Sequence, residues 1–163
     1  MPENKFAQLS SLLQGEIAMV ETMLEILASE KEALISREYE ALEKLAKDKE
    51  DLSAKLETSC KARIELLQLG KHGSPQQALQ TFLADASQVE TDQIRQLNMQ
   101  LIATLEDCRE KNIVNGQVIV SNMNTRQELV NLLSGQSGEA AVNVYTSTGD
   151  VKQAPDKGRH EEA

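Results

Sequence analysis

The chain has 163 residues, among them no tryptophan, two tyrosines and two phenylalanines, and its 26 acidic and 17 basic residues give a net charge of −9. This length is typical of one domain, and the negative charge argues against nucleic acid or an anionic membrane surface as the main partner. No segment is apolar for long enough to span a bilayer, and the first residues lack the apolar run of a signal peptide, so we expect a cytoplasmic protein without stable membrane insertion.

The first predicted helix covers residues 3–35. The composition, rich in Glu, Lys, Leu, Ala and Gln, favours long helices packed side by side. Aliphatic residues recur here at helical spacing, which predicts one buried face. Its members are Leu9, Leu12, Leu13, Ile17, Val20, Leu24, Leu27 and Leu34. The acidic residues are expected to lie largely off this face, namely Glu16, Glu21, Glu25, Glu30 and Glu32.

A break is expected at residues 35–39, because a continuous helix to residue 69 would measure roughly 100 Å and could not fold back to bury its own stripe. Ser36 is the candidate cap at this joint. The second helix then carries a heptad series, which consists of Leu42, Leu45, Lys49, Leu52, Leu56, Ser59, Arg63 and Leu66. Lys49 and Arg63 interrupt this series. Their aliphatic parts are expected to pack along the seam, with the charged groups reaching the solvent. For Arg63, a second interpretation is a hydrogen bond to an amide or carboxylate of the third long helix.

A glycine-rich stretch ends the second helix, and Ser74 followed by Pro75 predicts a new helix start with a serine cap and proline in the first turn. The short helix that follows either bends at residues 85–88 or continues into a third long helix over residues 89–133. We therefore predict an all-α fold, an elongated antiparallel bundle of three long helices plus one short helix, formed by residues 1–134.

Residues 135–163 are predicted to form a flexible C-terminal tail, because their apolar content is too low to offset the entropy of ordering them. The run 142–145 is the one strand-prone piece of this tail.

The seam of the third long helix has two apolar halves separated by amides. Leu97, Leu101 and Leu105 belong to the first half, which we expect to be buried within the bundle. Then Asn112, Asn115 and Asn122 take seam positions, with Gly116 beside them. A buried amide without a partner costs about 1–3 kcal/mol, and a polar seam residue sets register or partner choice. Two roles stay open for the amides: an internal network with Arg63 and the second helix, or direct contact with a partner.

Beyond the amides the apolar stripe resumes and reaches the helix end. Its members are Ile119, Met123, Leu129, Val130 and Leu133. One interpretation is burial within the chain's own bundle. The other is a groove for an amphipathic helix of another protein, in which flexible Met123 adapts to more than one partner.

The residues show no pattern of catalysis, metal binding or cofactor binding. The two histidines, His72 and His160, stand apart from any Glu-x-x-His spacing of the kind that bundle metal sites use. No phosphate loop or nucleophile elbow occurs. Cys60 and Cys108 are expected to be buried, reduced cysteines that act as small apolar residues. We therefore expect neither an enzyme nor a cofactor.

The order of residues in the third helix resembles the FlgN family of flagellar export chaperones. It comprises Asn-x-x-Asn-Gly from Asn112 to Gly116, the aliphatic pair Val118 and Ile119, then Arg126 and a leucine-rich end. Upstream, Lys49, Leu52 and Arg63 fit the family's pattern on the second helix. Downstream, Tyr145 with Gly149 four residues later resembles the family's tail signature.

This resemblance implies a cytoplasmic chaperone for hook–filament junction proteins, which are hook-associated proteins. It would bind their C-terminal amphipathic helices, prevent premature assembly and deliver them to the type III export apparatus, with its membrane export gate and export ATPase complex. The implied client-binding residues are Asn112, Asn115, Ile119, Asn122, Met123, Arg126, Leu129, Val130 and Leu133. Tyr145 and Gly149 are the implied residues for docking on the export gate.

The residues also allow a different class of function. The chain could be a homo-oligomeric coiled-coil adaptor or structural spacer, with the apolar stripe covered by copies of itself, and a homodimer is compatible with either function.

Overall fold

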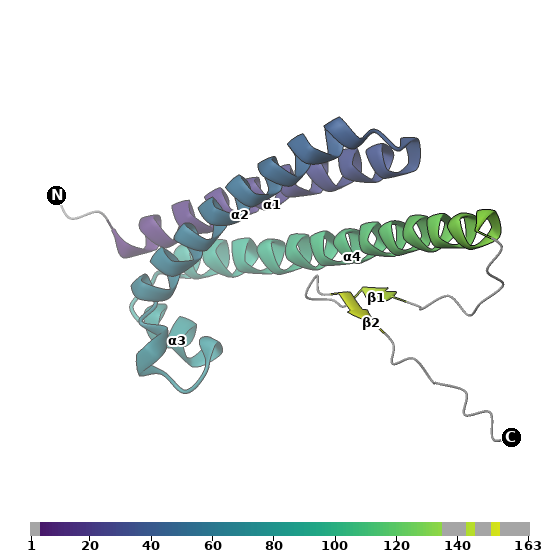
Figure 1. The fold of residues 1–163 in the computed structure, drawn as a ribbon. Coiled ribbons are helices and arrows are strands. Elements are labelled where there is room, and N and C mark those ends of the chain that lie inside the picture. The colour runs from purple at the N-terminus through teal and green to yellow at the C-terminus, as the bar shows by residue number, and fades with distance from the viewer. Residues whose placement is uncertain (1–3, 135–142, 146–150, 154–163) are drawn as a thin grey trace, which may run out of the picture.

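The computed structural model describes residues 4–134 and two short strands (Figure 1). The elements in chain order are α1 (Lys5–Ser36), α2 (Tyr39–Leu66), the 3-10 turn η1 (Leu69–Lys71), α3 (Pro75–Phe82), α4 (Gln88–Leu133), β1 (Asn143–Tyr145) and β2 (Val151–Gln153). The predicted bundle of three long helices and one short helix is confirmed.

The strands β1 and β2 pair antiparallel, with Asn143 opposite Gln153 and Tyr145 opposite Val151. β1 lies beside α4 (Figure 1). The strand-prone run is therefore a strand, and β2 is a second strand in the segment that was predicted to be flexible. The other residues of the predicted tail lie outside the described residues.

α1 is the helix that holds the other long helices together. It packs against both α2 and α4, whereas the Cα atoms of α2 and α4 never come within 8 Å of each other in the described residues. α2 runs antiparallel to α1, and α4 runs parallel to it (Figure 1). The largest fully buried side chains belong mainly to α1 and are Leu9, Leu13, Val20, Leu27 and, from α4, Ile94.

The joint between α1 and α2 falls inside the predicted break. α1 begins at a cap in which the Asn4 side chain accepts a hydrogen bond from the backbone N–H of Phe6 at 3.0 Å. It ends where Arg37 takes the left-handed conformation, with φ 57°. That conformation costs a side-chain-bearing residue about 1–2 kcal/mol. The prediction of Ser36 as a cap is wrong, because Ser36 is the last residue of α1 and α2 starts after Glu38 without a side-chain cap.

Two ion pairs fix the register between α1 and α2. Arg63 Nε donates to Glu16 Oε2 at 2.7 Å, and Lys49 Nζ donates to Glu30 Oε2 at 3.0 Å. The two glutamates are two heptads apart on α1, and the two cations are two heptads apart on α2 in the opposite order. Antiparallel helices bring such sets together at a single register.

These pairs overturn two sequence predictions. Glu16 and Glu30 do not lie off the apolar face but are buried, with 3% and 9% of their surface exposed. The charged groups of Lys49 and Arg63 do not reach the solvent as predicted, because both bind carboxylates of α1. The other interpretation of Arg63, a hydrogen bond to the third long helix, is also wrong, because its partner Glu16 is on the first helix.

The other end of the bundle is closed by α3 and the start of α4. Ser74 caps α3 as predicted, with its hydroxyl accepting from the backbone N–H of Gln77 at 3.2 Å, and Pro75 lies in the first turn. The chain then bends, and α4 begins at a capping box between Ser87 and Glu90. Of the two predicted possibilities for residues 85–88, the bend is therefore the one observed. The only two phenylalanines of the chain, Phe6 and Phe82, meet edge to face at 5.5 Å.

Candidate functional site

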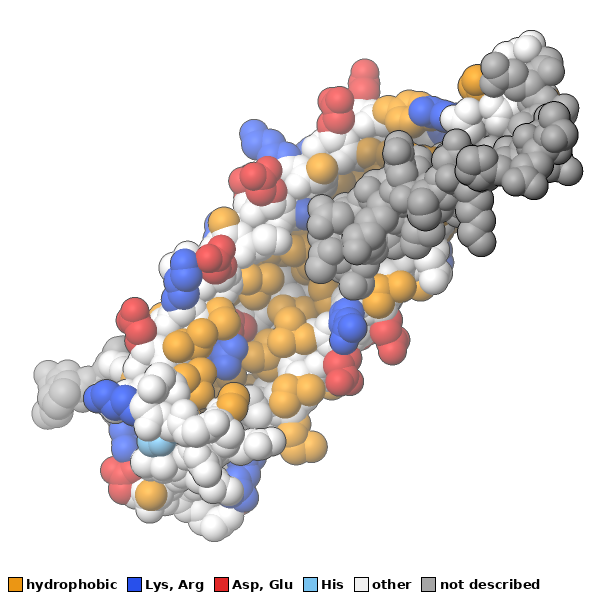
Figure 2. Space-filling model, turned by 60° about the horizontal axis from the view of Figure 1, so that its bottom comes forward, with side chains coloured by type: hydrophobic (Ala, Val, Ile, Leu, Met, Phe, Trp, Pro, Cys, Tyr) orange, Lys and Arg blue, Asp and Glu red, His pale blue; other side chains and the backbone are white. Residues whose placement is uncertain are grey.

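A groove runs between α2 and α4, with α1 as its floor. Because α2 is backed by α1 alone, none of its residues is buried, and its apolar stripe is half-buried. Leu97 and Cys108 of α4 and Leu56 of α2 pack against the edge of the core. Figure 2 shows hydrophobic side chains gathered in an elongated hollow on one face of the molecule, with charged side chains along its edges.

Two of the predicted amides attach α4 to α1. Asn115 is 2% exposed, and its Nδ2 donates to the carbonyl oxygen of Leu27 at 2.9 Å and to Glu30 Oε1 at 3.0 Å. One heptad later, Asn122 Nδ2 donates to the carbonyl oxygen of Leu34 at 3.3 Å. Asn115 is thus explained by the internal alternative and is not available at the surface for a partner. The network involves α1 and Lys49, and Arg63 takes no part in it.

Asn112 differs from the other amides because it is exposed. Its Oδ1 accepts from Lys49 Nζ at 3.3 Å, and the same ammonium binds Glu30. Lysine only donates, so the oxygen of the amide must face it. The contact joins α2 to α4 across the groove.

The end of α4 extends beyond α1. The hydrogen bonds from Asn115 to the Leu27 carbonyl and from Asn122 to the Leu34 carbonyl each join residues 88 positions apart. By the same offset, Ser36 at the end of α1 lies beside residue 124 of α4. The final residues of α4, 125–133, therefore extend past α1. Four apolar side chains there are more than half exposed: Leu129 at 52%, Val130 at 56%, Leu132 at 77% and Leu133 at 87%.

The first half of the α4 seam is less uniformly buried than predicted. Leu101 is 3% exposed and Leu97 is half-buried, as expected for a bundle core. Leu105 is 44% exposed, so the prediction of its burial is wrong. Among the long helices only α1 packs closely on α4, so a seam residue that is not covered by α1 has no second long helix to cover it.

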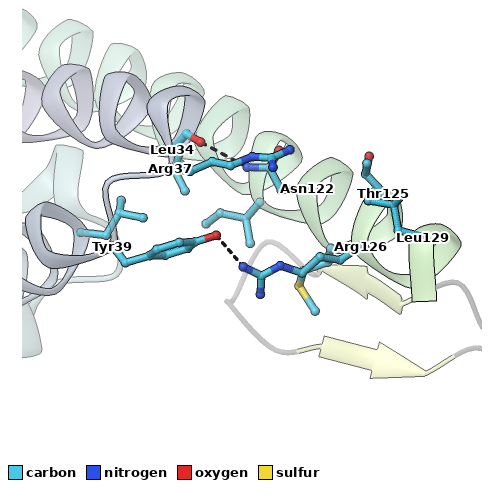
Figure 3. A pocket seen from close by; sticks show the side chains of 10 residues that line it. Leu34, Arg37, Tyr39, Asn122, Thr125, Arg126 and Leu129 are labelled. Carbon is cyan, nitrogen blue, oxygen red and sulfur yellow. Dashed lines mark hydrogen bonds between the residues drawn. The ribbon is translucent and has the colours of Figure 1, made fainter. Parts of the chain in front are cut away.

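A pocket of about 170 Å³ lies where α1 ends, α2 begins and α4 passes (Figure 3). Its lining is Leu34, Arg37, Tyr39, Leu42, Ile119, Asn122, Met123, Thr125, Arg126 and Leu129. Arg126 Nη2 donates a hydrogen bond to the Tyr39 hydroxyl, and its guanidinium carbon lies 5.5 Å from the centre of the tyrosine ring.

The structure brings together five of the nine predicted client-binding residues. Ile119, Asn122, Met123, Arg126 and Leu129 all line the pocket. Val130 and Leu133 follow on the extension beyond it. The backbone of Tyr145 is in β1, and Gly149 lies outside the described residues.

Sequence reasoning missed Tyr39 and Arg37 as pocket residues. The available signal for Tyr39 was an aromatic residue at the start of a helix in a chain with only two tyrosines and two phenylalanines. Arg37 gave no such signal, since its role depends on the left-handed turn.

Among the described residues, no His, Cys, Asp and Glu side chains form a group of three or more able to hold a metal ion. In the same part of the chain, no helix combines the length and apolar character needed to cross a bilayer. Cys60 and Cys108 are free and half-buried. Burial raises the pKa of the Cys108 thiol.

Comparisons with known proteins gave one match. A family model described as FlgN protein matches residues 1–153. No curated protein and no solved structure matches the chain significantly.

Proposed function

The chain belongs to the FlgN family of flagellar export chaperones, and on this premise we propose that it binds the C-terminal amphipathic helices of hook–filament junction proteins. In this proposal it acts in the cytoplasm, keeps its clients from assembling prematurely and delivers them to the type III export apparatus. No catalytic role is assigned to it.

The observation that supports client binding is the exposed apolar end of α4. Leu129, Val130, Leu132 and Leu133 lie past the end of α1 and are 52–87% exposed. Isolated exposed leucines need no explanation, but four within five residues, next to an apolar pocket, are typical of a surface that a partner covers. Covering them would contribute roughly 4–6 kcal/mol before the cost of association is subtracted.

A helix is the partner shape that fits this surface. An amphipathic helix places side chains at intervals of three and four into an elongated apolar groove. The groove is bounded by two helices, so the incoming helix would complete the packing that α2 and α4 leave open. Asn112, exposed beside Lys49, would give such a helix a polar contact point that fixes its position.

Client binding can be tested by titrating the full-length chain with peptides of the C-terminal helices of the junction proteins from the same cell. Leu129→Asp and Leu133→Asp should abolish binding while far-UV circular dichroism stays unchanged, because both residues are exposed and on one helix end. Met99→Asp is the matched control, since Met99 is 71% exposed on the same helix but outside the stripe. Unchanged affinity in both leucine variants would show that the client binds elsewhere.

The tail has a separate role in this proposal, which is to dock the loaded chaperone on the export gate through Tyr145 and Gly149. Tyr145→Ala should therefore leave client affinity intact and reduce export of the junction proteins into the medium. A loss of client affinity in this variant would contradict the division of roles.

The alternative function is a homo-oligomeric adaptor or spacer, and the same exposed leucines favour it, because a second copy could cover them. Light scattering of the chain with and without client peptide separates the two functions. A chaperone gives a defined complex with the client. An adaptor gives a stable oligomer that the peptide does not change.

A further inference from the structure

The pocket at the joint of α1 and α2 has the size of a single side chain. Its volume is about 170 Å³. An apolar cavity of about 150 Å³ accommodates a benzene molecule. Leu34, Leu42, Ile119, Met123 and Leu129 supply the apolar part of the lining. The pocket therefore fits one bulky apolar side chain and excludes a whole helix.

The pocket also carries positive charge in an acidic protein. Arg37 and Arg126 line it, and none of its ten lining residues is acidic, although the chain has a net charge of −9. Neither guanidinium has a carboxylate partner among the described residues. By contrast, Lys49 and Arg63 are each paired with a glutamate, and Lys5, which lies over the Phe6 and Phe82 rings, is paired with Asp85.

Tyr39 holds Arg126 in place without neutralising it. The tyrosine hydroxyl accepts one of the five N–H groups of the guanidinium, which leaves the others free. Figure 3 shows Arg126 reaching from α4 toward Tyr39, and Arg37 reaching from the end of α1 toward Asn122. Arginine is the cation best suited to bind a carboxylate through two parallel hydrogen bonds.

We propose that this pocket binds a bulky apolar side chain of the client helix, and that Arg37 and Arg126 bind an Asp or Glu side chain one helical turn away from it. Residues three or four positions apart lie on the same face of a helix, so the two groups can reach the pocket and its arginines together. This inference rests on the proposed function and narrows its clients to helices with an acidic residue next to the apolar anchor.

A double-mutant cycle tests the pairing of charges. The probe is the C-terminal helix peptide of a junction protein, amidated at its C-terminus so that only side-chain carboxylates remain, with each acidic residue next to a bulky apolar residue changed in turn to the amide. Binding to the full-length chain is measured for wild type, Arg126→Gln and Arg37→Gln. Arg95→Gln is the control, since Arg95 is exposed on α4 and does not line the pocket.

We expect Arg126→Gln and one peptide substitution each to raise Kd about five-fold, and the two together to raise it little further, because they remove the same pair. Wild-type binding should weaken with added salt more than Arg126→Gln binding. The inference is overturned if the effects multiply, if Arg95→Gln weakens binding as much, or if a tight-binding helix has no carboxylate near an apolar anchor. In these cases client binding itself stands. If no junction-protein peptide binds the wild type, the proposed function fails and the inference fails with it.

Discussion

The buried ion pair between Glu16 and Arg63 makes the most decisive prediction about stability. Replacing Arg63 with methionine keeps most of the apolar stem and removes the charge. Glu16 is 3% exposed and receives its 2.7 Å hydrogen bond from Arg63 Nε, so the variant leaves a carboxylate buried without its partner. Breaking a buried pair in this way costs 3–5 kcal/mol. Because 22% of the arginine side chain is exposed, we expect the lower end, about 3 kcal/mol.

The assay is thermal unfolding followed by circular dichroism. For a chain of this size, 1 kcal/mol shifts Tm by about 2–4 °C, so Arg63→Met should lower Tm by roughly 6–12 °C. The double variant Glu16→Leu with Arg63→Met replaces this ion pair with two apolar side chains. It should regain the wild-type Tm or exceed it, since replacing a buried pair by packed apolar residues is often neutral or stabilising.

Lys61→Met is the matched control. Lys61 lies on the same helix and pairs with Glu57 at 2.9 Å, but both side chains are mostly exposed, so its loss should change Tm little. The reasoning is refuted if Arg63→Met shifts Tm no more than Lys61→Met does, or if the double variant is as unstable as the single one.

Four further predictions concern α4. Asn115→Ala should lower the free energy of unfolding in urea by about 1–3 kcal/mol, because the buried Glu30 carboxylate keeps Lys49 but loses the amide donor, and the Leu27 carbonyl loses its bond to α4. An unchanged midpoint would mean that the amide is not a structural contact. Ser87→Ala should cost about 1 kcal/mol in the same assay through loss of the cap. The Ser87 backbone N–H, the Asn4 side chain and the Ser87 hydroxyl lower the pKa of Glu90, so its contribution is present above the ordinary carboxyl pKa and lost as pH falls through the folded value. Glu90→Gln should thus be less stable than wild type at neutral pH and equal to it in strong acid, and a pH-independent difference would contradict this. In a Cys60→Ser variant, alkylation of Cys108 by iodoacetamide should rise with pH along a curve displaced above that of free cysteine, and coincidence of the curves would show that burial does not raise the pKa of this thiol.

The sequence predicted the features that depend on local signals. The serine and proline before α3 act as a start because their effects are confined to one turn. The break between Ser36 and Tyr39, inside the predicted range 35–39, followed from length, since a single continuous helix could not bury its own stripe. The residue types at 142–145 indicated strand propensity, although the tail was predicted to be flexible, and Asn143–Tyr145 is a strand.

Features that depend on the register between helices were not predicted. The pattern of α1 by itself predicts that Glu16 and Glu30 face solvent, because their partners are on α2. The two glutamates of α1 and the two cations of α2 share a spacing of two heptads, and that signal was present in the sequence. Comparing both stripes in antiparallel order would have found the pairs.

The candidate site was predicted in part. The stripe from Ile119 to Leu133 is where it was expected, but the sequence left burial and exposure open. Exposure depends on how far α4 extends past α1, and only the offset of 88 residues decides that. The pocket could not be predicted, because it forms between the turn around Arg37 and a part of α4 that is distant from that turn in sequence.

The separation of 88 residues between contacts of α1 and α4 also bears on how the protein forms during synthesis. The hairpin of α1 and α2 closes through a short local turn and can form once residue 66 has left the ribosome. At about 5–20 residues per second, the remaining residues to 133 take roughly 3–13 seconds to appear. During that interval, the nascent hairpin exposes the apolar face of α1 that α4 later covers. Until α4 has been synthesised, the nascent chain therefore exposes apolar surface that is prone to aggregation.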